Sequence, residues 1–105
     1  MSKSSTITDP EWLHNAHAGE ILLSEFMQPL NMTSKDLAAS LAVDSACLDA
    51  VISGEKPVSA ELDLRLGRFF QMSEGFFLRL QDSYELLEAK RTLNGALDRI
   101  TPHAA

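Results

Sequence analysis

The segment TSKDLAASLAVDSACLDAV, which begins at Thr33, constrains the fold of this chain more than any other stretch. Thr33 and Asp36 match a capping box, in which a hydroxyl and a carboxylate each accept a backbone N–H at the start of a helix. Asp44 is placed to cap a second helix. Two helix starts so close together require a sharp turn between short helices at 34–41 and 45–53. This spacing fits a DNA-binding helix-turn-helix motif and an ordinary helical hairpin about equally well.

Apolar residues within the two segments predict which faces are buried. The first helix should bury one stripe, formed by Leu37, Ala38 and Leu41. The second repeats apolar residues at intervals of three and four, at Leu48, Val51 and Ile52. This leaves small and polar residues on its outer face: Ser45, Ala46, Asp49, Ala50 and Ser53. Gly54 is well placed to end the helix, since Pro57 prevents its continuation. We expect Cys47 to be a small, semi-buried packing residue.

Three further helices are expected around this pair, and a short helix or turn carrying Trp12 and Leu13 is possible before them. The first main helix starts after His17, which we expect to order its beginning, and ends near Pro29. One face of this helix should be apolar, formed by Ile21, Leu22, Phe26 and Leu30. Ser59 is expected to cap a fourth helix, and Ser73 a fifth. Phe76, Phe77 and Leu80, at the start of the fifth helix, should complete the core.

The chain is therefore predicted to be all-α, with five helices and an extended C-terminal helix. We expect a flexible tail with a possible short helix at 1–16, a helix-turn-helix domain at 17–80, a C-terminal helix at 81–100 and a tail at 101–105. An apolar stripe continues along the last helix beyond the part that one small domain could cover: Tyr84, Leu87, Leu93, Leu97 and Ile100. Such a surplus favours a dimer or partner contact over a helix that folds back on its own domain. The last helix could end near Leu93 or run past Gly95 to Ile100.

Composition narrows the functional classes. The chain has 105 residues and one cysteine, so one domain without an internal disulfide is expected. Its N-terminal segment is polar, and no stretch is long and apolar enough for a membrane span, so we expect a cytoplasmic protein with no membrane partner. His14 and His17 lack a third ligand for a metal site. Because no nucleophile–base pair, phosphate loop or carboxylate pair is recognisable, we expect neither an enzyme nor a cofactor.

Charge bears on nucleic-acid binding. The formal net charge is −6, and the motif with its following loop holds only two lysines, Lys35 and Lys56, against four acidic residues: Asp36, Asp44, Asp49 and Glu55. The local charge of −2 opposes a broad footprint on phosphates. Asp49 could still accept from a cytosine amino group, and Ala46 or Ala50 could touch a thymine methyl. Three arginines, Arg65, Arg68 and Arg79, fit either a phosphate-contacting rim or a solvated helix face.

Three segments carry a resemblance to a known family: HAGEILLSEFMQPLNMTSKDLAASLAV from His17, VISGEKPVSAELDLRLGRFF from Val51 and SEGFFLRLQDSYEL from Ser73. Together they resemble the HigA/VapI-type antidote proteins, which are phage-repressor-like (Xre-class) helix-turn-helix members of bacterial toxin–antitoxin operons. The resemblance implies an all-α, five-helix fold with a C-terminal dimer element. It also implies a repressor of its own promoter that neutralises a toxin, usually an mRNA-cleaving ribonuclease.

Under this reading the partners are double-stranded operator DNA, a second copy of the chain and a small basic toxin. The residues expected nearest the bases are Ser45, Ala46 and Asp49, and those nearest phosphates are Ser34, Lys35, Ser53 and Lys56. Within the family pattern, Asn is frequent where Asp49 stands and Gln is common where Ser34 stands. The alternative is a degenerate helix-turn-helix that no longer reads DNA and acts only through protein contacts.

Overall fold

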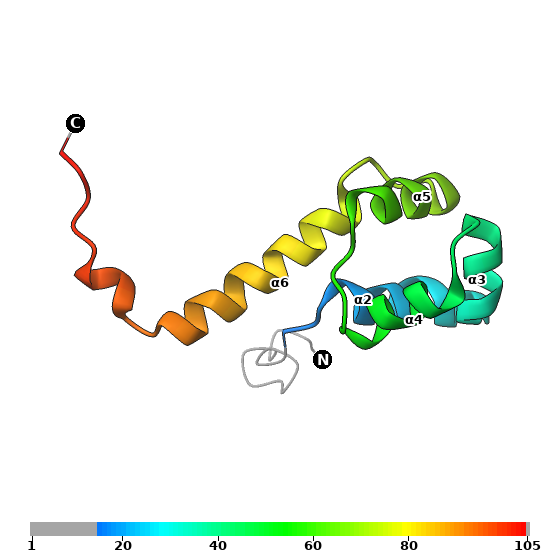
Figure 1. Ribbon diagram of the computed structural model, residues 1–105, viewed down its shortest axis with the longest axis horizontal. Coiled ribbons are helices and arrows are strands. Elements are labelled where there is room, and N and C mark those ends of the chain that lie inside the picture. Colours follow the sequence, from blue (N-terminus) through cyan, green and yellow to red (C-terminus); the bar gives the residue numbers. More distant parts are fainter. Residues whose placement is uncertain (1–14, 105) are drawn as a thin grey trace, which may run out of the picture.

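The computed structural model describes residues 15–104, which form only helices and their connections (Figure 1). The expectations for the tail and the short helix around Trp12 lie mostly outside the described residues. In chain order the elements are α2 (Ala18–Ile21), a π-helical segment (Leu22–Met27), a 3₁₀ turn (Gln28–Leu30), α3 (Ser34–Leu41), α4 (Ser45–Ser53), α5 (Ala60–Phe70), α6 (Phe76–Leu93) and a second 3₁₀ turn (Ala96–Arg99). The predicted all-α fold is confirmed.

The first main helix is irregular, and this explains one wrong prediction. It starts as α2, widens into the π-helical segment and tightens into a 3₁₀ turn around Pro29. Neither kind of turn keeps the 3.6-residue period, so positions four apart no longer share a face. Leu30, expected to be in the core, is 60% exposed. Leu22 is buried and Phe26 packs against the core as predicted.

The helix pair α3–α4 forms as the sequence predicts. Thr33 and Asp36 make a reciprocal capping box, with the Asp36 N–H donating to Thr33 Oγ1 at 3.1 Å and the Thr33 N–H to Asp36 Oδ2 at 3.4 Å. Ala42 takes the left-handed conformation (φ 59°), and the carboxylate of Asp44 then accepts from the Ala46 N–H at 3.1 Å. Gly54 ends α4 with φ 90°. These short-range hydrogen bonds fix the turn between the two helices.

The start of α6 differs from the prediction. Ser59 caps α5 as expected, but Ser73 does not cap α6, whose N-cap is Gly75 with φ 88° and no local side-chain bond. The side chain of Asp63, in α5, supplies the missing acceptor. Its two carboxylate oxygens accept from the N–H groups of Gly75 (2.7 Å), Phe77 (2.8 Å) and Leu78 (3.1 Å). Asp63 is only 1% exposed, so a buried carboxylate ties α5 to the beginning of α6.

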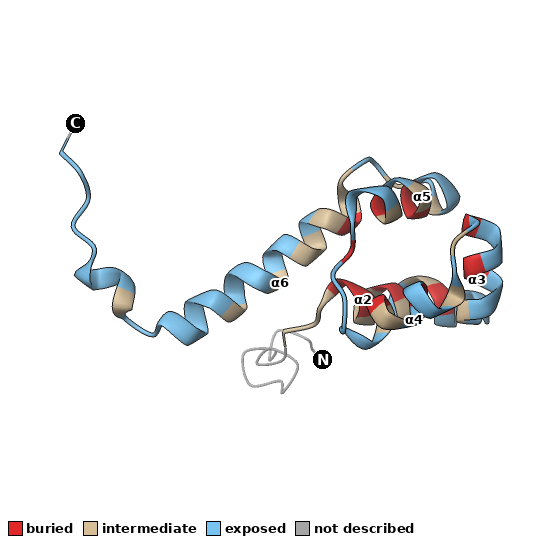
Figure 2. Cartoon of the chain, viewed as in Figure 1, coloured by how far each residue is buried: buried red, intermediate tan, exposed pale blue. Residues whose placement is uncertain are grey.

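The core is enclosed by α2, the π-helical segment, α3, α4, α5 and the first turns of α6, and α6 then leaves it (Figures 1 and 2). Phe77 is fully buried, and the ring of Phe26 lies 5.2 Å from it and 5.0 Å from that of Phe70. Beyond its first turns α6 is mostly exposed (Figure 2). The alternative of a helix folded back on its own domain is therefore wrong. The helix ends at Leu93, where Asn94 and Gly95 adopt positive φ, so it does not continue to Ile100.

Replacing Asp63 by Ala should lower the free energy of unfolding by about 3 kcal/mol, because three N–H groups at the start of α6 lose a charged acceptor in a buried setting. Asp63→Asn should cost less, since one amide oxygen still accepts from Phe77 and Leu78. Chemical denaturation followed by circular dichroism measures both changes. Asp82→Ala, an exposed carboxylate on α6, is the control, and an equal loss in that variant would contradict the capping role.

Candidate nucleic-acid interface

Helix α4 presents one face to the core and the opposite face to solvent. Leu48 and Val51 are buried, whereas Ala46, Asp49 and Ser53 are exposed. The other two residues predicted to face outward, Ser45 and Ala50, are half-buried. The exposed positions recur at intervals of three and four, so they form a stripe along the helix. A convex stripe on the second helix of a helix-turn-helix pair has the shape that fits the major groove.

A glycine sets how closely α4 approaches the preceding helix. Gly19 of α2 is buried, and a Cβ placed there would lie 1.9 Å from the carbonyl oxygen of Val51 and 2.9 Å from the Cα of Ile52. Backbone atoms leave no room for any side chain at this crossing. Gly19 therefore fixes the depth at which α4 sits on the domain.

His17 joins the start of α2 to the end of α4. Its Nδ1 accepts from the N–H groups of Gly19 (3.1 Å) and Glu20 (3.3 Å), and the Glu20 carboxylate accepts from the His17 N–H. The imidazole also lies beside Gly54, where a Cβ would be 2.9 Å from Nε2, and meets the Tyr84 ring edge-on at 5.8 Å. The prediction that His17 orders this helix start is confirmed.

The polar residues predicted to meet phosphates differ in their exposure and in the hydrogen bonds that they already make within the chain. Lys35 and Lys56 are exposed, and Ser34 is half-buried at the first position of α3. The hydroxyl of Ser53 donates to the Ala50 carbonyl at 3.1 Å and accepts from the Glu55 N–H at 3.4 Å. The hydroxyl proton of Ser53 is therefore already engaged within the chain. Among the residues predicted to meet phosphates, the cationic groups are those of Lys35 and Lys56, and both residues are exposed.

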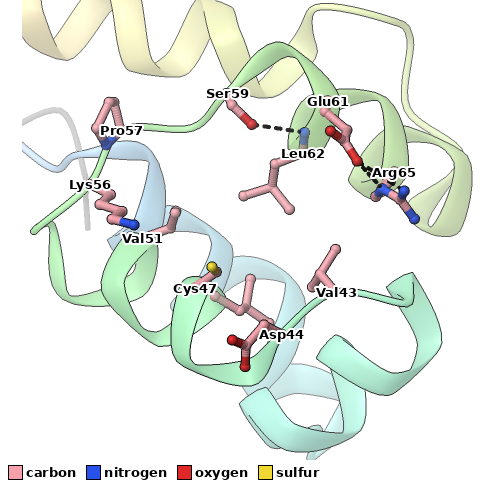
Figure 3. Close-up of a pocket in the computed structure, with 11 residues that line it drawn as sticks. Val43, Asp44, Cys47, Val51, Lys56, Pro57, Ser59, Glu61, Leu62 and Arg65 are labelled. Atoms are coloured by element: carbon pink, nitrogen blue, oxygen red, sulfur yellow. Dashed lines mark hydrogen bonds and ion pairs between the residues drawn. The ribbon is translucent and has the colours of Figure 1, made fainter.

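A cleft of about 320 Å³ separates α4 from α5, and the loop carrying Lys56 and Pro57 closes one end of it (Figure 3). Cys47 lines this cleft and is exposed, so the prediction of a semi-buried packing residue is wrong. The reason is that α5 does not pack down onto the first turn of α4. No chemical signal in the sequence marks this gap, because it depends on the angle between two helices.

The three arginines do not form a free phosphate-binding rim. Arg65 donates to the Glu61 carboxylate at 2.9 and 3.1 Å and to the Leu41 carbonyl at 2.8 Å, which ties α5 to the end of α3. Arg79 donates to the Ser73 hydroxyl and the Glu74 carbonyl. Arg68 is exposed. Arg65 therefore joins two helices, and Arg79 bonds to the turn before its own helix.

The predicted C-terminal stripe is largely exposed. Four residues of this stripe are exposed: Leu87, Leu93, Leu97 and Ile100, the last at 66%. Leu86, which was not predicted as part of the stripe, is 62% exposed. Tyr84 differs, because it is half-buried against His17, and its carbonyl accepts from the Asn15 side chain at 2.8 Å.

Two negative findings apply to residues 15–104. No group of three or more histidine, cysteine or acidic side chains there could hold a metal ion. None of the helices in that range is sufficiently long and apolar to cross a membrane.

The arrangement of α3 and α4 on this all-helical domain defines a helix-turn-helix transcription regulator. No protein-family model matches the chain. The HTH-type transcriptional regulator YbaQ of Escherichia coli is 31% identical over 75 residues, which cover 71% of this chain and 66% of that protein.

Comparison with solved structures identifies the family to which the chain belongs. A HigA-family addiction module antidote protein from Coxiella burnetii is 31% identical with a TM-score of 0.79, over 86% of this chain and 99% of that one. Pseudomonas aeruginosa PA4674, solved in complex with its operator DNA, is 30% identical with a TM-score of 0.81, over 88% and 98%. The chain belongs to the HigA family of helix-turn-helix antidote proteins.

Gly19→Ala should lower the free energy of unfolding by about 3 kcal/mol, because the added methyl collides with the backbone of α4. Gly67→Ala is the matched control, since its Cβ would lie 3.1 Å from the nearest atom, the Met72 carbonyl oxygen, and needs only a small shift. Urea unfolding of both variants tests this close crossing. Equal stability of the two would show that α2 and α4 are not held at this distance.

Proposed function

We propose that the protein is a dimeric, antitoxin-type repressor that binds operator DNA through α4 and neutralises a cognate ribonuclease toxin. The observation that carries this proposal is the exposed stripe of α4 on a fold shared with PA4674, which was solved on its operator. The caps of α4 and the Gly19 crossing hold the α4 stripe at the surface of the domain.

Contacts to DNA are assigned by position on the helix pair. Ser45, Ala46 and Asp49 would lie nearest the base edges, because recognition helices contact bases with their N-terminal residues. Ser34, Lys35, Ser53 and Lys56 would lie nearest phosphates, with Ser53 rotating away from the Ala50 carbonyl to donate. The N–H groups of Ser34 and Ser45, the first residues of the two helices, would add further phosphate donors, whereas those of Asp36 and Ala46 are bonded to the cap side chains.

The dimer and toxin contacts are assigned to residues 81–100, which we propose form a partner element separate from the helix-turn-helix domain at 17–80. Leu86 and Leu93 lie two turns apart on α6 and are exposed, as are Leu97 and Ile100 beyond its end. A row of exposed leucines on a projecting helix is typical of a helix-pairing surface. The formal charge of −6 favours a basic partner such as a small ribonuclease.

A second candidate function is a protein-contact module that has lost DNA reading. It is supported by the acidic helix pair, in which α4 carries no basic residue. The two functions differ in one observable, which is selective binding to promoter DNA.

The purified protein should bind a duplex of its own promoter more tightly than a scrambled duplex. If Lys35 and Lys56 are the main phosphate contacts in each of two subunits, the slope of log affinity against log salt should be about −4, at roughly 0.9 per contact. Lys35→Ala should make this slope shallower by about 2, whereas Ser40→Ala, which changes an exposed and uncharged residue of the same helix, should leave it unchanged. Fluorescence anisotropy across a salt series measures both effects. Absence of selective binding at low salt would favour the protein-contact module.

The double variant Leu86→Glu/Leu93→Glu should convert a dimer, twice the 11.6 kDa chain mass, into a monomer, because carboxylates on the pairing face are desolvated or repel each other. Leu30→Glu introduces the same change at an exposed leucine outside α6 and should remain dimeric. Light scattering after size exclusion gives the masses. A dimer that survives the double variant places the interface elsewhere.

A further inference from the structure

We infer that α4 recognises the major-groove edges of pyrimidines, with Asp49 accepting from a cytosine amino group and Ala46 touching a thymine methyl on a neighbouring base pair. This inference rests on the proposed function, because it requires α4 to enter the major groove. It goes further by naming the chemical groups that an operator half-site must present.

The first step is that α4 has almost no donors to offer. Its residues, SACLDAVIS, include none of the side chains that read guanine or adenine by paired hydrogen bonds, which are Arg, Lys, Asn and Gln. Of its two hydroxyls, that of Ser53 already donates to Ala50, and Ser45 is half-buried. The thiol of Cys47 is a weak donor and lies in the cleft beside α5. Guanine, which shows only acceptors in the major groove, therefore has no strong partner on this helix.

The second step is that one strong acceptor is free. Asp49 is exposed, and its carboxylate makes no hydrogen bond or ion pair with any described residue. The other acidic groups of the helix pair are engaged, since Asp44 caps α4 and Asp36 caps α3. Asp49 is thus the one carboxylate on the α4 stripe that is available to a base.

The third step compares what each base shows to a carboxylate. Cytosine presents its N4 amino group, which is a donor with no acceptor beside it on the same base. Adenine presents an amino group next to the N7 acceptor, and guanine and thymine present acceptors that repel an anion. Asp49 therefore favours cytosine, because guanine and thymine repel the carboxylate and the N7 acceptor beside the adenine amino group weakens a bond there.

The fourth step places Ala46 beside Asp49. The two residues are three apart on α4, which is about 4.5 Å along the helix axis and close to one base step of about 3.4 Å. Both are exposed, and the methyl group of Ala46 offers only apolar contact. Thymine alone carries a methyl group in the major groove, so the pair of residues matches adjacent cytosine and thymine.

The test begins with selection of bound duplexes from a random-sequence library by the wild type, Asp49→Asn and Glu74→Gln. The wild type should fix a cytosine at one position of each half-site. Asp49→Asn should change that position to adenine, because an amide pairs with adenine N6 and N7. Glu74→Gln removes one negative charge from an exposed residue between α5 and α6 and should leave the preference at cytosine. A C·G preference that Asp49→Asn leaves unchanged would overturn the inference, because Asp49 would then not be its source.

A chemical arm uses the selected duplex with single-atom changes. Replacing the cytosine by N4-methylcytosine, or the thymine by uracil, should each weaken wild-type binding, the first by about tenfold. Asp49→Ala should abolish the response to N4-methylcytosine. Substitution of 7-deazaguanine on the opposite strand should have no effect. Selective binding that ignores the first two analogues overturns this inference and leaves the proposed repressor intact, whereas no selective binding at low salt overturns both.

Discussion

The buried carboxylate of Asp63 is the interaction on which the layout of the molecule depends. The N-cap residue of α6, Gly75, has a left-handed backbone conformation, and no side chain near it in the sequence caps the helix. Asp63 reaches across from α5 and accepts from three N–H groups of that first turn. An anion at a helix N-terminus is also favoured by the helix dipole. One side chain thereby fixes where α6 starts and in which direction it leaves the core (Figure 1).

The two surfaces to which we assign the proposed DNA and partner contacts lie on different parts of the chain. Helix α4 is held on the domain by the Gly19 crossing, and the exposed leucines stand on the distal part of α6. The connection between the two surfaces runs through His17, whose ring meets Tyr84 of α6 and lies beside Gly54 at the end of α4. The Val58 N–H, in the loop after α4, also donates to the Gln81 side chain at 3.4 Å. A partner bound to α6 would therefore be linked to α4, the helix proposed to contact DNA, through these residues.

The parts of this structure that the sequence predicts are those set by local spacing. Thr33 with Asp36, Asp44 and Ser59 each bond to a backbone group two or three residues away, so their patterns are visible in the chain. The cap on α6 is supplied by Asp63, which is twelve or more residues away in the sequence. The sequence pattern around Asp63 does not indicate which N–H groups its carboxylate binds. The predicted burial of Leu30 and of Cys47 was wrong for a related reason. The exposure of Leu30 follows from a change of helix type, and that of Cys47 depends on the angle between α4 and α5.

The acidic character of α3 and α4 places a limit on how the proposed repressor could gain affinity. Each subunit offers two exposed lysines beside the α4 stripe and no base on the helix itself, so a single subunit would gain little from phosphate neutralisation. Pairing two subunits through α6, as proposed, would double the number of phosphate contacts and make the second half-site an intramolecular binding event. DNA affinity in this protein should then depend on dimerisation more steeply than in a relative with a basic recognition helix. A toxin that competes for the α6 surface would consequently control promoter binding without touching α4.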